Sequence, residues 1–287
     1  MVCFLGLIFW GLRLGVDFTG GSVYELKFEE EISTEKATNV LEEKGLKVTS
    51  VSSTSGGSYL FRLQALSEEQ KKLVKEILQE EFKSVEELRF EVVGPSIGPE
   101  LVKKTVYAIL IAATCLLLWI AYQFKSFKFG TSAVLAMLHD SFILIGMFSL
   151  LGFFWQAEVD FLFVTALLTT LSFSVHDTIV VFDRIREISK KQGGELVDVA
   201  NRALTETMVR SLNNSFTIIF MLMALLLLGG TTVKWFAAAL LIGTILGTYS
   251  SPFVAVPILV SWDNIFGFFR KRFKTFVFRH DKSEIKF

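Results

Sequence analysis

The sequence predicts a polytopic α-helical membrane protein that carries one small α+β domain outside the membrane. Hydrophobic residues make up 52% of the 287 residues and are concentrated in long runs, which is typical of membrane-spanning helices. The one long polar segment lies between the first and second of these runs, as an outer domain would. The formal net charge is zero, so the overall charge gives no indication of a nucleic-acid partner.

Six apolar runs predict six transmembrane helices. They are residues 1–12, 105–122, 132–155, 161–182, 215–229 and 235–262. The first run is short, because its 12 residues at about 1.5 Å per residue give roughly 18 Å against a hydrocarbon core of about 30 Å. We nevertheless expect it to span, since the polar segment after it needs a route out of the membrane. We therefore expect that the chain has lost its start or follows on from a preceding polypeptide.

These runs divide the chain into four parts. The parts are a shortened first helix at 1–12, an outer domain at 13–104, helices two to six within 105–262, and a basic tail at 263–287. Lys and Arg gather in the short loops and the tail on one side of the membrane, while the opposite short loops hold Lys234 alone. Because Lys and Arg are enriched on the cytoplasmic side, both termini are predicted to be cytoplasmic and the domain at 13–104 extracytoplasmic.

The outer domain has an order of strands and helices found in ferredoxin-like folds. Alternating and β-rich segments predict strands at 22–28, 46–53, 58–64 and 85–93. Ser33 is the expected cap of a first helix that ends at Gly45. Ser67 and Gln70 form a capping-box pattern that opens a second helix, which runs through Phe82. The resulting order βαββαβ is the ferredoxin-like arrangement.

A carboxylate within the fourth run, Asp177, is the most informative single residue. A charge inside a spanning helix is energetically costly, so it needs a partner or a function. Helical spacing predicts a polar stripe on this helix, made of Thr170, Ser174, Asp177 and Val181. The same spacing predicts a second stripe on the fifth helix, made of Arg210, Asn213, Asn214 and Thr217.

Two such stripes facing each other would let Arg210 pair with Asp177 and let Asn213 and Asn214 satisfy the remaining polar groups. Under one interpretation, Asp177 takes up a proton from one side of the membrane, separates from Arg210 and releases the proton to the other side. Under the other, a static ion pair locks two helices together. Because buried ion pairs add little stability over apolar packing, we favour the proton site.

Three further side chains are candidates for accessory roles in proton transfer. Asp140 in the third run either joins the same polar centre or lies near the cytoplasmic interface in contact with water, and the spacing leaves both open. His176 either bonds to Ser172, four residues back, or relays protons, because imidazole titrates near neutral pH. Ser174 shares the stripe of Asp177.

No metal site and no resident cofactor are expected, with protons as the coupling ion. Cys3 and Cys115 both lie in apolar runs, which is typical of small buried side chains rather than a disulfide or a metal pair. An intramembrane aspartyl protease built on Asp140 and Asp177 is disfavoured, because Ser-Val-His-Asp is not the Gly-x-Gly-Asp pattern of that class. A neighbouring Arg210 would also hold the aspartate ionised. The chain is therefore predicted not to be an enzyme.

Four segments resemble the SecD/SecF family of protein export subunits. They are Gly15-Val16-Asp17-Phe18-Thr19-Gly20-Gly21 after the first run, 93–98 (VGPSIG) before the second, 177–187 (DTIVVFDRIRE) ending the fourth, and 210–215 (RSLNNS) opening the fifth. The third segment, with Asp183 and Arg184, is close to the SecF form of the motif. The first segment alone does not separate SecF from SecD.

The resemblance implies an accessory subunit of the Sec protein translocase, from the resistance-nodulation-division superfamily. With SecD, such a subunit uses the proton-motive force to promote protein export across the bacterial inner membrane. The implied partners are SecD, the SecYEG translocon, YajC- or YidC-type subunits, the unfolded secreted polypeptide and membrane lipid. Asp177 and Arg210 are implied to be proton-relay residues. A structural signature at the membrane exit is also implied, made of Gly15, Asp17, Phe18, Gly20 and Gly21.

This chain departs from the family pattern beside the central aspartate. The family usually has G-Y-S-[IV]-N-D where residues 172–177 are SFSVHD, so His176 replaces an asparagine and brings a titratable group. Two alternatives stay open. One is a lipid or drug exporter half of the same superfamily, although those carry large domains in two outer loops. The other is a non-energised scaffold that stabilises the translocon. If the subunit is energised, we expect the outer domain to act as a lever hinged near 13–17 and 93–99.

Overall fold

The computed structural model describes residues 2–54, 57–94 and 97–262. The predicted basic tail, and the part of the predicted hinge at residues 95–96, lie outside the described residues. The chain forms two compact units. Of the described residues, the first unit contains those within 1–110, 145–166 and 225–238, and the second contains those within 111–144, 167–224 and 239–262. Several long helices pass through both units.

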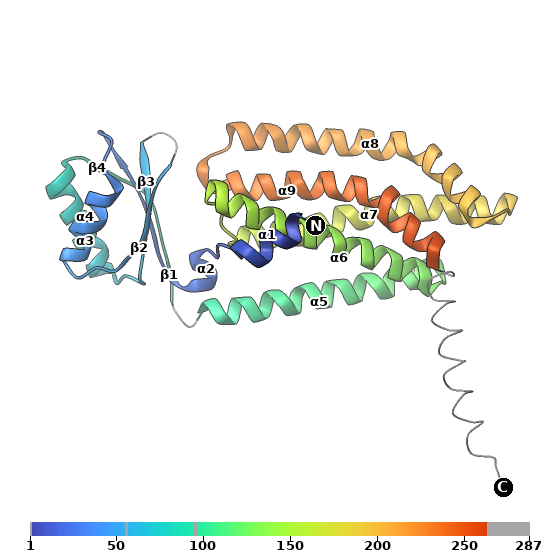
Figure 1. Cartoon of the computed structure of the whole chain (residues 1–287), viewed down its shortest axis with the longest axis horizontal. Helices are drawn as coiled ribbons and strands as arrows, with labels where there is room; N and C mark the ends of the chain where they lie inside the picture. The colour runs from blue at the N-terminus through green and yellow to red at the C-terminus, as the bar shows by residue number, and fades with distance from the viewer. Residues whose placement is uncertain (1, 55–56, 95–96, 263–287) are drawn as a thin grey trace, which may run out of the picture. The chain divides into compact units, whose positions relative to one another are not determined.

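The outer domain of the first unit confirms the predicted ferredoxin-like order. Its elements are β1 (Gly21–Phe28), α3 (Thr34–Glu43), β2 (Val48–Thr54), β3 (Ser58–Leu63), α4 (Glu68–Phe82) and β4 (Val85–Val93). The four strands pair antiparallel in the order β2-β3-β1-β4. Helices α3 and α4 lie on one face of this sheet (Figure 1).

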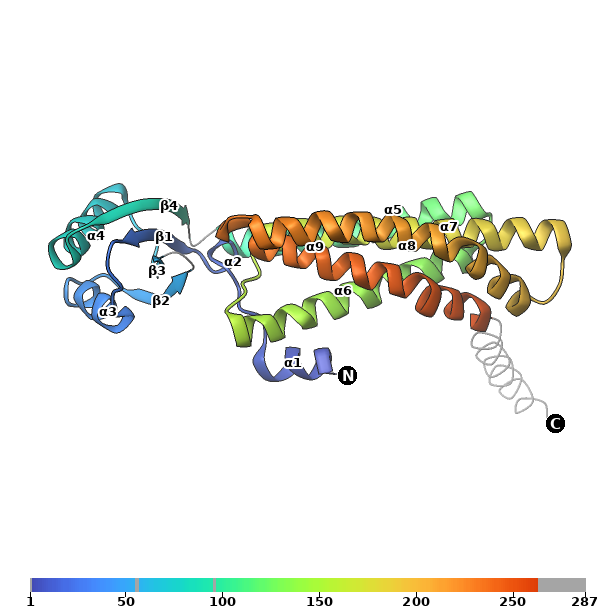
Figure 2. The ribbon, with the colours of Figure 1, turned by 90° about the horizontal axis from the view of Figure 1, so that it is seen from above.

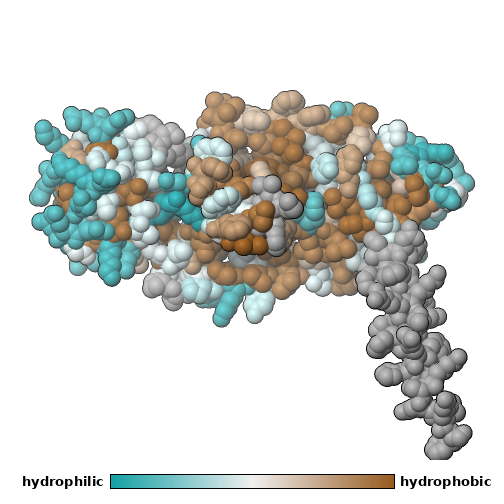
Figure 3. All heavy atoms as spheres, viewed as in Figure 1, coloured by the Kyte–Doolittle hydropathy of each residue, from teal (hydrophilic) through white to brown (hydrophobic). Residues whose placement is uncertain are grey.

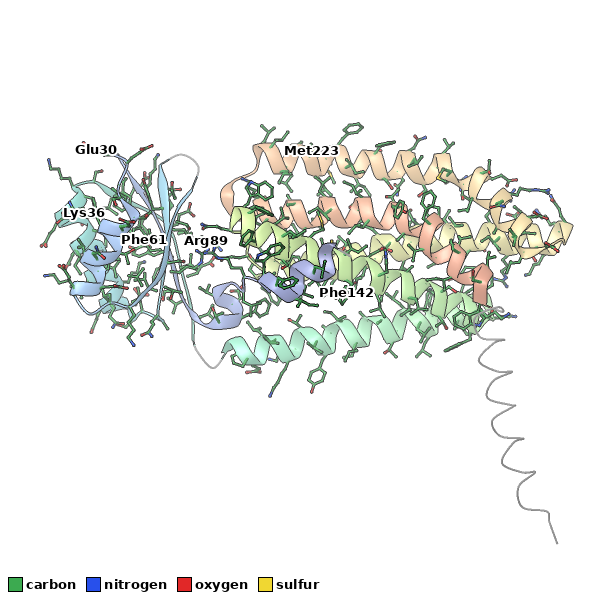
Figure 4. All side chains as sticks on the ribbon, viewed as in Figure 1. Glu30, Lys36, Phe61, Arg89, Phe142 and Met223 are labelled. Atoms are coloured by element: carbon green, nitrogen blue, oxygen red, sulfur yellow. The ribbon has the colours of Figure 1, made fainter. Side chains whose placement is uncertain are left out.

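Local sequence signals explain where the two helices of this domain begin. The Ser33 side chain accepts a hydrogen bond from the backbone N–H of Lys36, and Ser67 with Gln70 forms the predicted capping box at the start of α4. Both caps satisfy backbone donors that the first turn of a helix leaves unpaired. Phe61, labelled in Figure 4, lies in the core between the sheet and the two helices and is fully buried.

A short entry segment precedes the sheet. It consists of α1 (Val2–Trp10) and α2 (Val16–Thr19). Helix α1 packs closely on the C-terminal part of α6 (Phe127–Trp155), where a Cβ on Gly146 would lie 2.5 Å from the Cβ of Cys3. The Ser149 hydroxyl also donates to the carbonyl of Gly6 at 3.0 Å. The hydroxyl of Ser149 and the absence of a Cβ at Gly146 therefore explain how closely α1 approaches α6.

Five helices in the described part of the chain are long and apolar enough to cross a membrane. They are α5 (Ile97–Phe124), α6, α7 (Phe161–Gln192), α8 (Leu196–Leu228) and α9 (Thr231–Ser250), the last continued to Trp262 through a π-helical turn at Ser251–Ala255. These helices confirm five of the six predicted spans. Helix α1 has 9 residues and falls short of that length. Figure 3 shows apolar side chains over the long helices and polar ones over α3 and α4.

Helices α7 and α8 extend beyond the apolar runs that predicted them, past Phe182 and to the N-terminal side of Ser215. Ion pairs stabilise these polar extensions, because Arg184 on α7 contacts both Glu187 on the same helix and Glu206 on α8. The predicted signature residue Arg184 therefore joins two helices, whereas its neighbour Asp183 is exposed. The predicted ends were too short because the apolar pattern marks the lipid-facing length rather than the helix.

The core of the second unit is apolar and draws on every long helix. Its buried side chains include Ile120 on α5, Met137 on α6, Phe182 on α7, Ala203 on α8 and Leu259 after the π-turn. Helices α7, α8 and α9 run beside one another in both ribbon views (Figures 1 and 2). This packing places the buried carboxylates of the long helices within an apolar surrounding.

Candidate functional site

Asp177 is buried on α7, with 8% of its surface exposed. The whole predicted stripe of this helix is buried, because Thr170, Ser174 and Val181 are each less exposed than Asp177. Among the described residues, the hydrogen-bond donor to Asp177 is the hydroxyl of Ser211 on α8, whose Oγ lies 2.9 Å from the Asp177 Oδ2. A hydroxyl is neutral, so this contact supports the carboxylate without balancing its charge.

The predicted ion pair between Arg210 and Asp177 is wrong for this structure. Among the described residues no ion pair joins them, and Arg210 lies exposed on α8. Successive helical residues point about 100° apart, so the helix can turn either Arg210 or Ser211 toward α7, but not both. The inward face carries Thr207, Ser211 and Ser215 instead. The predicted polar face of α8 therefore has the correct helical spacing, but the face that turns toward α7 is the neighbouring one, which carries Ser211.

Asp140 joins the polar centre, which settles the alternative that the sequence left open. It is 6% exposed and lies on α6. Its Oδ2 accepts hydrogen bonds from the Ser174 hydroxyl on α7, at 2.6 Å, and from the Ser250 hydroxyl on α9. One carboxylate on α6 thereby contacts two other helices. Ser174, predicted as an accessory residue, serves Asp140 rather than Asp177.

The two histidines that precede these aspartates differ in their contacts. His139 on α6 lies with its Nδ1 3.1 Å from the Asp140 Oδ1, and its side chain is 39% exposed. His176 on α7 is exposed and makes no hydrogen bond to Ser172 in the described part of the chain. The predicted bond to Ser172 is therefore not formed.

A small cavity lies beside Asp177. It has a volume of about 20 Å³, which is room for a water molecule. Polar groups on three helices line it, among them Asp177 and His176 on α7, Asn214 on α8 and Thr248 on α9. Of the predicted stripe on α8, Asn214 therefore does reach the neighbourhood of Asp177, whereas Asn213 is exposed and does not line the cavity.

Two glycines allow α9 to approach α7 closely. A Cβ on Gly243 would lie 2.2 Å from the Cγ2 of Thr170, and a Cβ on Gly247 would lie 3.0 Å from the Cα of Ser174. These glycines form a small-xxx-small motif, which permits close helix packing. The contact brings the hydroxyls of α9 within reach of α6 and α7.

The π-turn at Ser251–Ala255 completes this hydroxyl-rich region. Pro252 has no N–H, so it cannot donate to the carbonyl four residues before it. At the end of the turn, the Val256 N–H bonds to the carbonyl of Ser251, five residues back, rather than to that of Pro252, four residues back. Just before and at this turn, Ser250 contacts Asp140 and Ser251 contacts the hydroxyl of Thr178 at 3.0 Å. Two adjacent serines thus serve two different neighbouring helices.

The predicted signature at the membrane exit ties the start of the outer domain to the start of α7. The Asp17 Oδ2 accepts a hydrogen bond from the backbone N–H of Phe161, the first residue of α7, at 2.8 Å. The N–H of Gly15 donates to the carbonyl of Val159 at 2.8 Å. Burial raises the pKa of the neighbouring Asp160 carboxyl, and the charge of Asp17 raises it further. These contacts confine the exit segment.

Backbone conformation and close contacts require glycine at two positions of this signature. Gly20 and Gly21 have φ values of 73° and 132°, in the region that favours glycine, and a Cβ on Gly21 would lie 2.7 Å from the carbonyl oxygen of Leu63. Phe18, whose ring is buried, belongs to the same turn. Gly98 at the start of α5 packs against the carbonyl of Phe18, where a Cβ would lie 2.4 Å from the oxygen. The signature is therefore a compact joint.

Sequence reasoning missed Ser211, Ser250, Ser251 and Thr248. The last three lie in an apolar run and looked like ordinary helix residues. One signal was available: hydroxyl residues recur at helical spacing through Thr244, Thr248 and Ser251, on the side of the helix that also carries Gly243 and Gly247.

Taken together, the described residues form a polytopic membrane protein with two buried carboxylates in its long helices, Asp140 and Asp177, and a small α+β domain. Residues 73–265 match the family of the SecD/SecF protein export membrane proteins, C-terminal part, and residues 7–32 match the SecD/SecF GG motif. The chain belongs to the SecD/SecF family, as a SecF-type member.

Relatives that are matched over most of their length support this assignment. The chain is 43% identical to the protein translocase subunit SecF of Thermobaculum terrenum, over 90% of this chain and 87% of the relative, and 38% identical to the subunit of Sebaldella termitidis, over 87% and 82%. The crystal structure of SecDF, a translocon-associated membrane protein from Thermus thermophilus, matches with a TM-score of 0.81 and 34% identity. That match covers 91% of this chain and 36% of the SecDF chain.

Proposed function

We propose that this chain works with SecD as an accessory, non-enzymatic subunit of the Sec protein translocase and uses the proton-motive force to promote protein export. The observation that carries the proposal is the environment of Asp177. This carboxylate lies within a membrane helix, and the donor that contacts it is the neutral hydroxyl of Ser211. Asp177 has no ion pair with Lys or Arg in the described part of the chain, and such a buried carboxylate binds a proton readily, because protonation removes the cost of burying its charge.

Proton uptake and release at Asp177 would be coupled to rearrangement of the helices. The charged form needs donors and water, and the cavity of about 20 Å³ beside it can supply one water molecule. The neutral form can lose them at lower cost. One charge moved across 100 mV provides about 2.3 kcal/mol, so several protons would be needed for each movement of a polypeptide segment.

The exposed face of α8 supports a partner within the membrane. Arg210 and Asn213 lie on this face and are exposed, just before the apolar run that begins at Ser215, which is where the membrane boundary would lie. Apolar side chains such as Met223 on α8 and Phe142 on α6 are also exposed (Figure 4). SecD is the partner that would cover the polar positions, since SecD and SecF are fused in SecDF relatives. Arg210 would then act in the proton relay from that shared surface.

The outer domain is the part that would act on the exported chain. We place it outside the bacterial inner membrane, with both termini of the chain in the cytoplasm. The joint formed by Asp17, Gly20 and Gly21 connects this domain to the start of α7, the helix that carries Asp177. In this proposal the outer domain would transmit movement of α7 to the unfolded secreted polypeptide that emerges from SecYEG. YajC- or YidC-type subunits would be further partners.

The direct test replaces Asp177 by asparagine. Asp177→Asn keeps the size of the side chain and removes its proton, so we expect the proton-dependent part of secretion to be lost while the complex with SecD still assembles. The matched control is Asp198→Asn, the same change at an exposed aspartate on α8. Secretion measured with and without an uncoupler separates the two parts. Secretion by Asp177→Asn at the rate of the unmodified chain would favour the scaffold function instead.

A second substitution tests the shared surface. Arg210→Ala should also abolish proton-dependent secretion, and Arg210→Lys should retain part of it, because a lysine keeps the charge. Co-purification with SecD measures assembly separately. Unchanged secretion by Arg210→Ala would remove Arg210 from the mechanism.

A further inference from the structure

The chain contains the dipeptide His-Asp twice within its membrane helices. His139-Asp140 lies on α6 and His176-Asp177 lies on α7. Asp177 is accounted for by the proposed function, whereas Asp140 is not. Yet Asp140 is the more buried of the two aspartates, and it is the one whose histidine contacts it.

The two oxygens of Asp140 have different roles. Oδ2 accepts hydrogen bonds from the hydroxyls of Ser174 and Ser250, on two other helices. Oδ1 receives neither of these hydroxyls and faces the Nδ1 of His139 at 3.1 Å. This leaves Oδ1 as the oxygen that can take up a proton, and the imidazole as the group placed to deliver it.

Exposure gives the pair a direction. The side chain of His139 is 39% exposed, while that of Asp140 is 8% exposed. In the scheme proposed below, a proton enters at the exposed side of the imidazole and reaches the carboxylate through it. Imidazole suits this step because it exchanges protons near neutral pH.

We propose that Asp140 is a second proton-binding site, loaded through His139 and separate from Asp177. In the transfer step, the Nδ1–H bond of the imidazolium breaks and an O–H bond forms at the Asp140 Oδ1. The electron pair of the broken bond stays on Nδ1 as a lone pair. An ion pair becomes a neutral imidazole beside a neutral carboxyl, and His139 then takes its next proton from water.

The groups around Asp140 are consistent with this role. In the part of the chain that the structure describes, α7 and α9 present it with hydroxyls, Ser174 and Ser250, while α6 presents His139. The nearest further carboxylate along α7 is Asp177, one turn after Ser174 on the same face. A negative charge on either aspartate disfavours a charge on the other, so loading of one site affects the second.

The coupling between Asp140 and Asp177 rests on the proposed function and extends it. Proton binding at Asp140 itself does not depend on the proposed function. The experiment therefore measures the proton itself. Infrared difference spectra of the purified full-length chain in lipid nanodiscs, taken across a pH titration, detect the C=O stretch of a protonated buried carboxyl. The background is Asp177→Asn, so that Asp177 contributes nothing to the band.

We expect a titrating carboxyl band in Asp177→Asn that is lost when Asp140→Asn is added. The band should persist when Asp160→Asn is added instead, which is the matched control at a carboxyl outside the spanning helices. After a rapid pH jump, His139→Gln should slow the appearance of the band by about tenfold or more, since a positioned proton donor contributes at least that much.

Two results would overturn the proposal. One is a band that Asp140→Asn leaves unchanged, and the other is the absence of any band in Asp177→Asn beyond that removed by Asp160→Asn. If Asp140→Asn does not fold, as judged by circular dichroism, Ser250→Ala replaces it. Loss of this hydroxyl donor should shift the frequency of the band, and an unshifted band would also count against Asp140. Export is not the readout, so the proposed function and this site can fail independently.

Discussion

The contact between α7 and α9 yields a sharp prediction for Gly243→Ala. A Cβ at this position would lie 2.2 Å from the Cγ2 and 2.6 Å from the Cβ of Thr170. Ordinary carbon contacts begin near 3.5 Å, so the overlap is about 1.3 Å. A rotamer change of Thr170 can move its Cγ2 but not its Cβ, so an overlap of about 0.9 Å remains. The two helices must separate.

The size of the effect depends on two opposing contributions. Overpacking a well-packed core costs about 1–3 kcal/mol. Alanine in place of glycine within a helix recovers at most about 1 kcal/mol. We therefore expect a net loss of about 1–2 kcal/mol in the free energy of unfolding. Separation of the helices should also lengthen the hydrogen bond from Ser250 to Asp140.

Unfolding in mixed micelles titrated with dodecyl sulfate, followed by tryptophan fluorescence, measures this loss. The control is Gly230→Ala, because a Cβ on Gly230 would meet no atom within 4 Å. Thr170→Gly removes the opposing atoms, so the double variant Gly243→Ala/Thr170→Gly should be more stable than the sum of the single changes predicts. The reasoning is refuted if Gly243→Ala costs no more than Gly230→Ala, or if the two changes are additive.

Three further predictions concern single contacts. Ser67→Ala removes the cap of α4 and should lower the stability of the chain by about 1 kcal/mol in thermal unfolding, whereas Ser67→Asp should retain most of it. The hydrogen bond from Lys71 holds the pKa of Glu87 below its ordinary value. The stabilisation from this contact is therefore present above about pH 4 and is lost as the pH falls through the folded-state pKa of Glu87. Glu87→Gln should be less stable than the unmodified chain at pH 7, and equal stability at that pH would contradict this. Ser211→Ala leaves Asp177 without its hydroxyl donor and should reduce proton-dependent secretion, while Ser211→Thr should preserve it.

The outer domain could be predicted from the sequence because its signals are local. Ser33 and Ser67 cap their helices as expected, and the strand ending at Val93 was predicted at its observed bounds. A cap or an alternating strand depends on a few adjacent residues, and the same sequence window contains all of them.

The pairing between the membrane helices could not be predicted in the same way. Helix α8 carries polar residues on two faces, one with Arg210 and Asn213 and the other with Ser211 and Ser215. Periodicity identifies both faces but does not say which one turns inward, because that depends on the neighbouring helix. The choice is made by close packing, in which the small hydroxyl of Ser211 fits against α7 and a long arginine does not.

The hydrogen bond from Ser250 to Asp140 could not be predicted from the sequence for a related reason. Ser250 is an ordinary residue within an apolar run, and nothing near it in the sequence indicates a carboxylate as its partner. Its position depends on the glycine contact between α9 and α7 and on the change of helical geometry after it. Both are tertiary features, and they combine residues separated by about a hundred positions in the chain.

The π-turn at Ser251–Ala255 also bears on how this helix tolerates insertions and deletions. A π-turn holds one residue more than an α-turn, so it absorbs a single inserted residue without changing the phase of the helix on its C-terminal side. Deleting the exposed Phe253 should therefore leave Val256 and Leu259 facing the core, where both are buried. Forcing regular α-helix through the same residues would instead rotate them by about 100°. Relatives with a straight helix here should align with a one-residue gap at this turn.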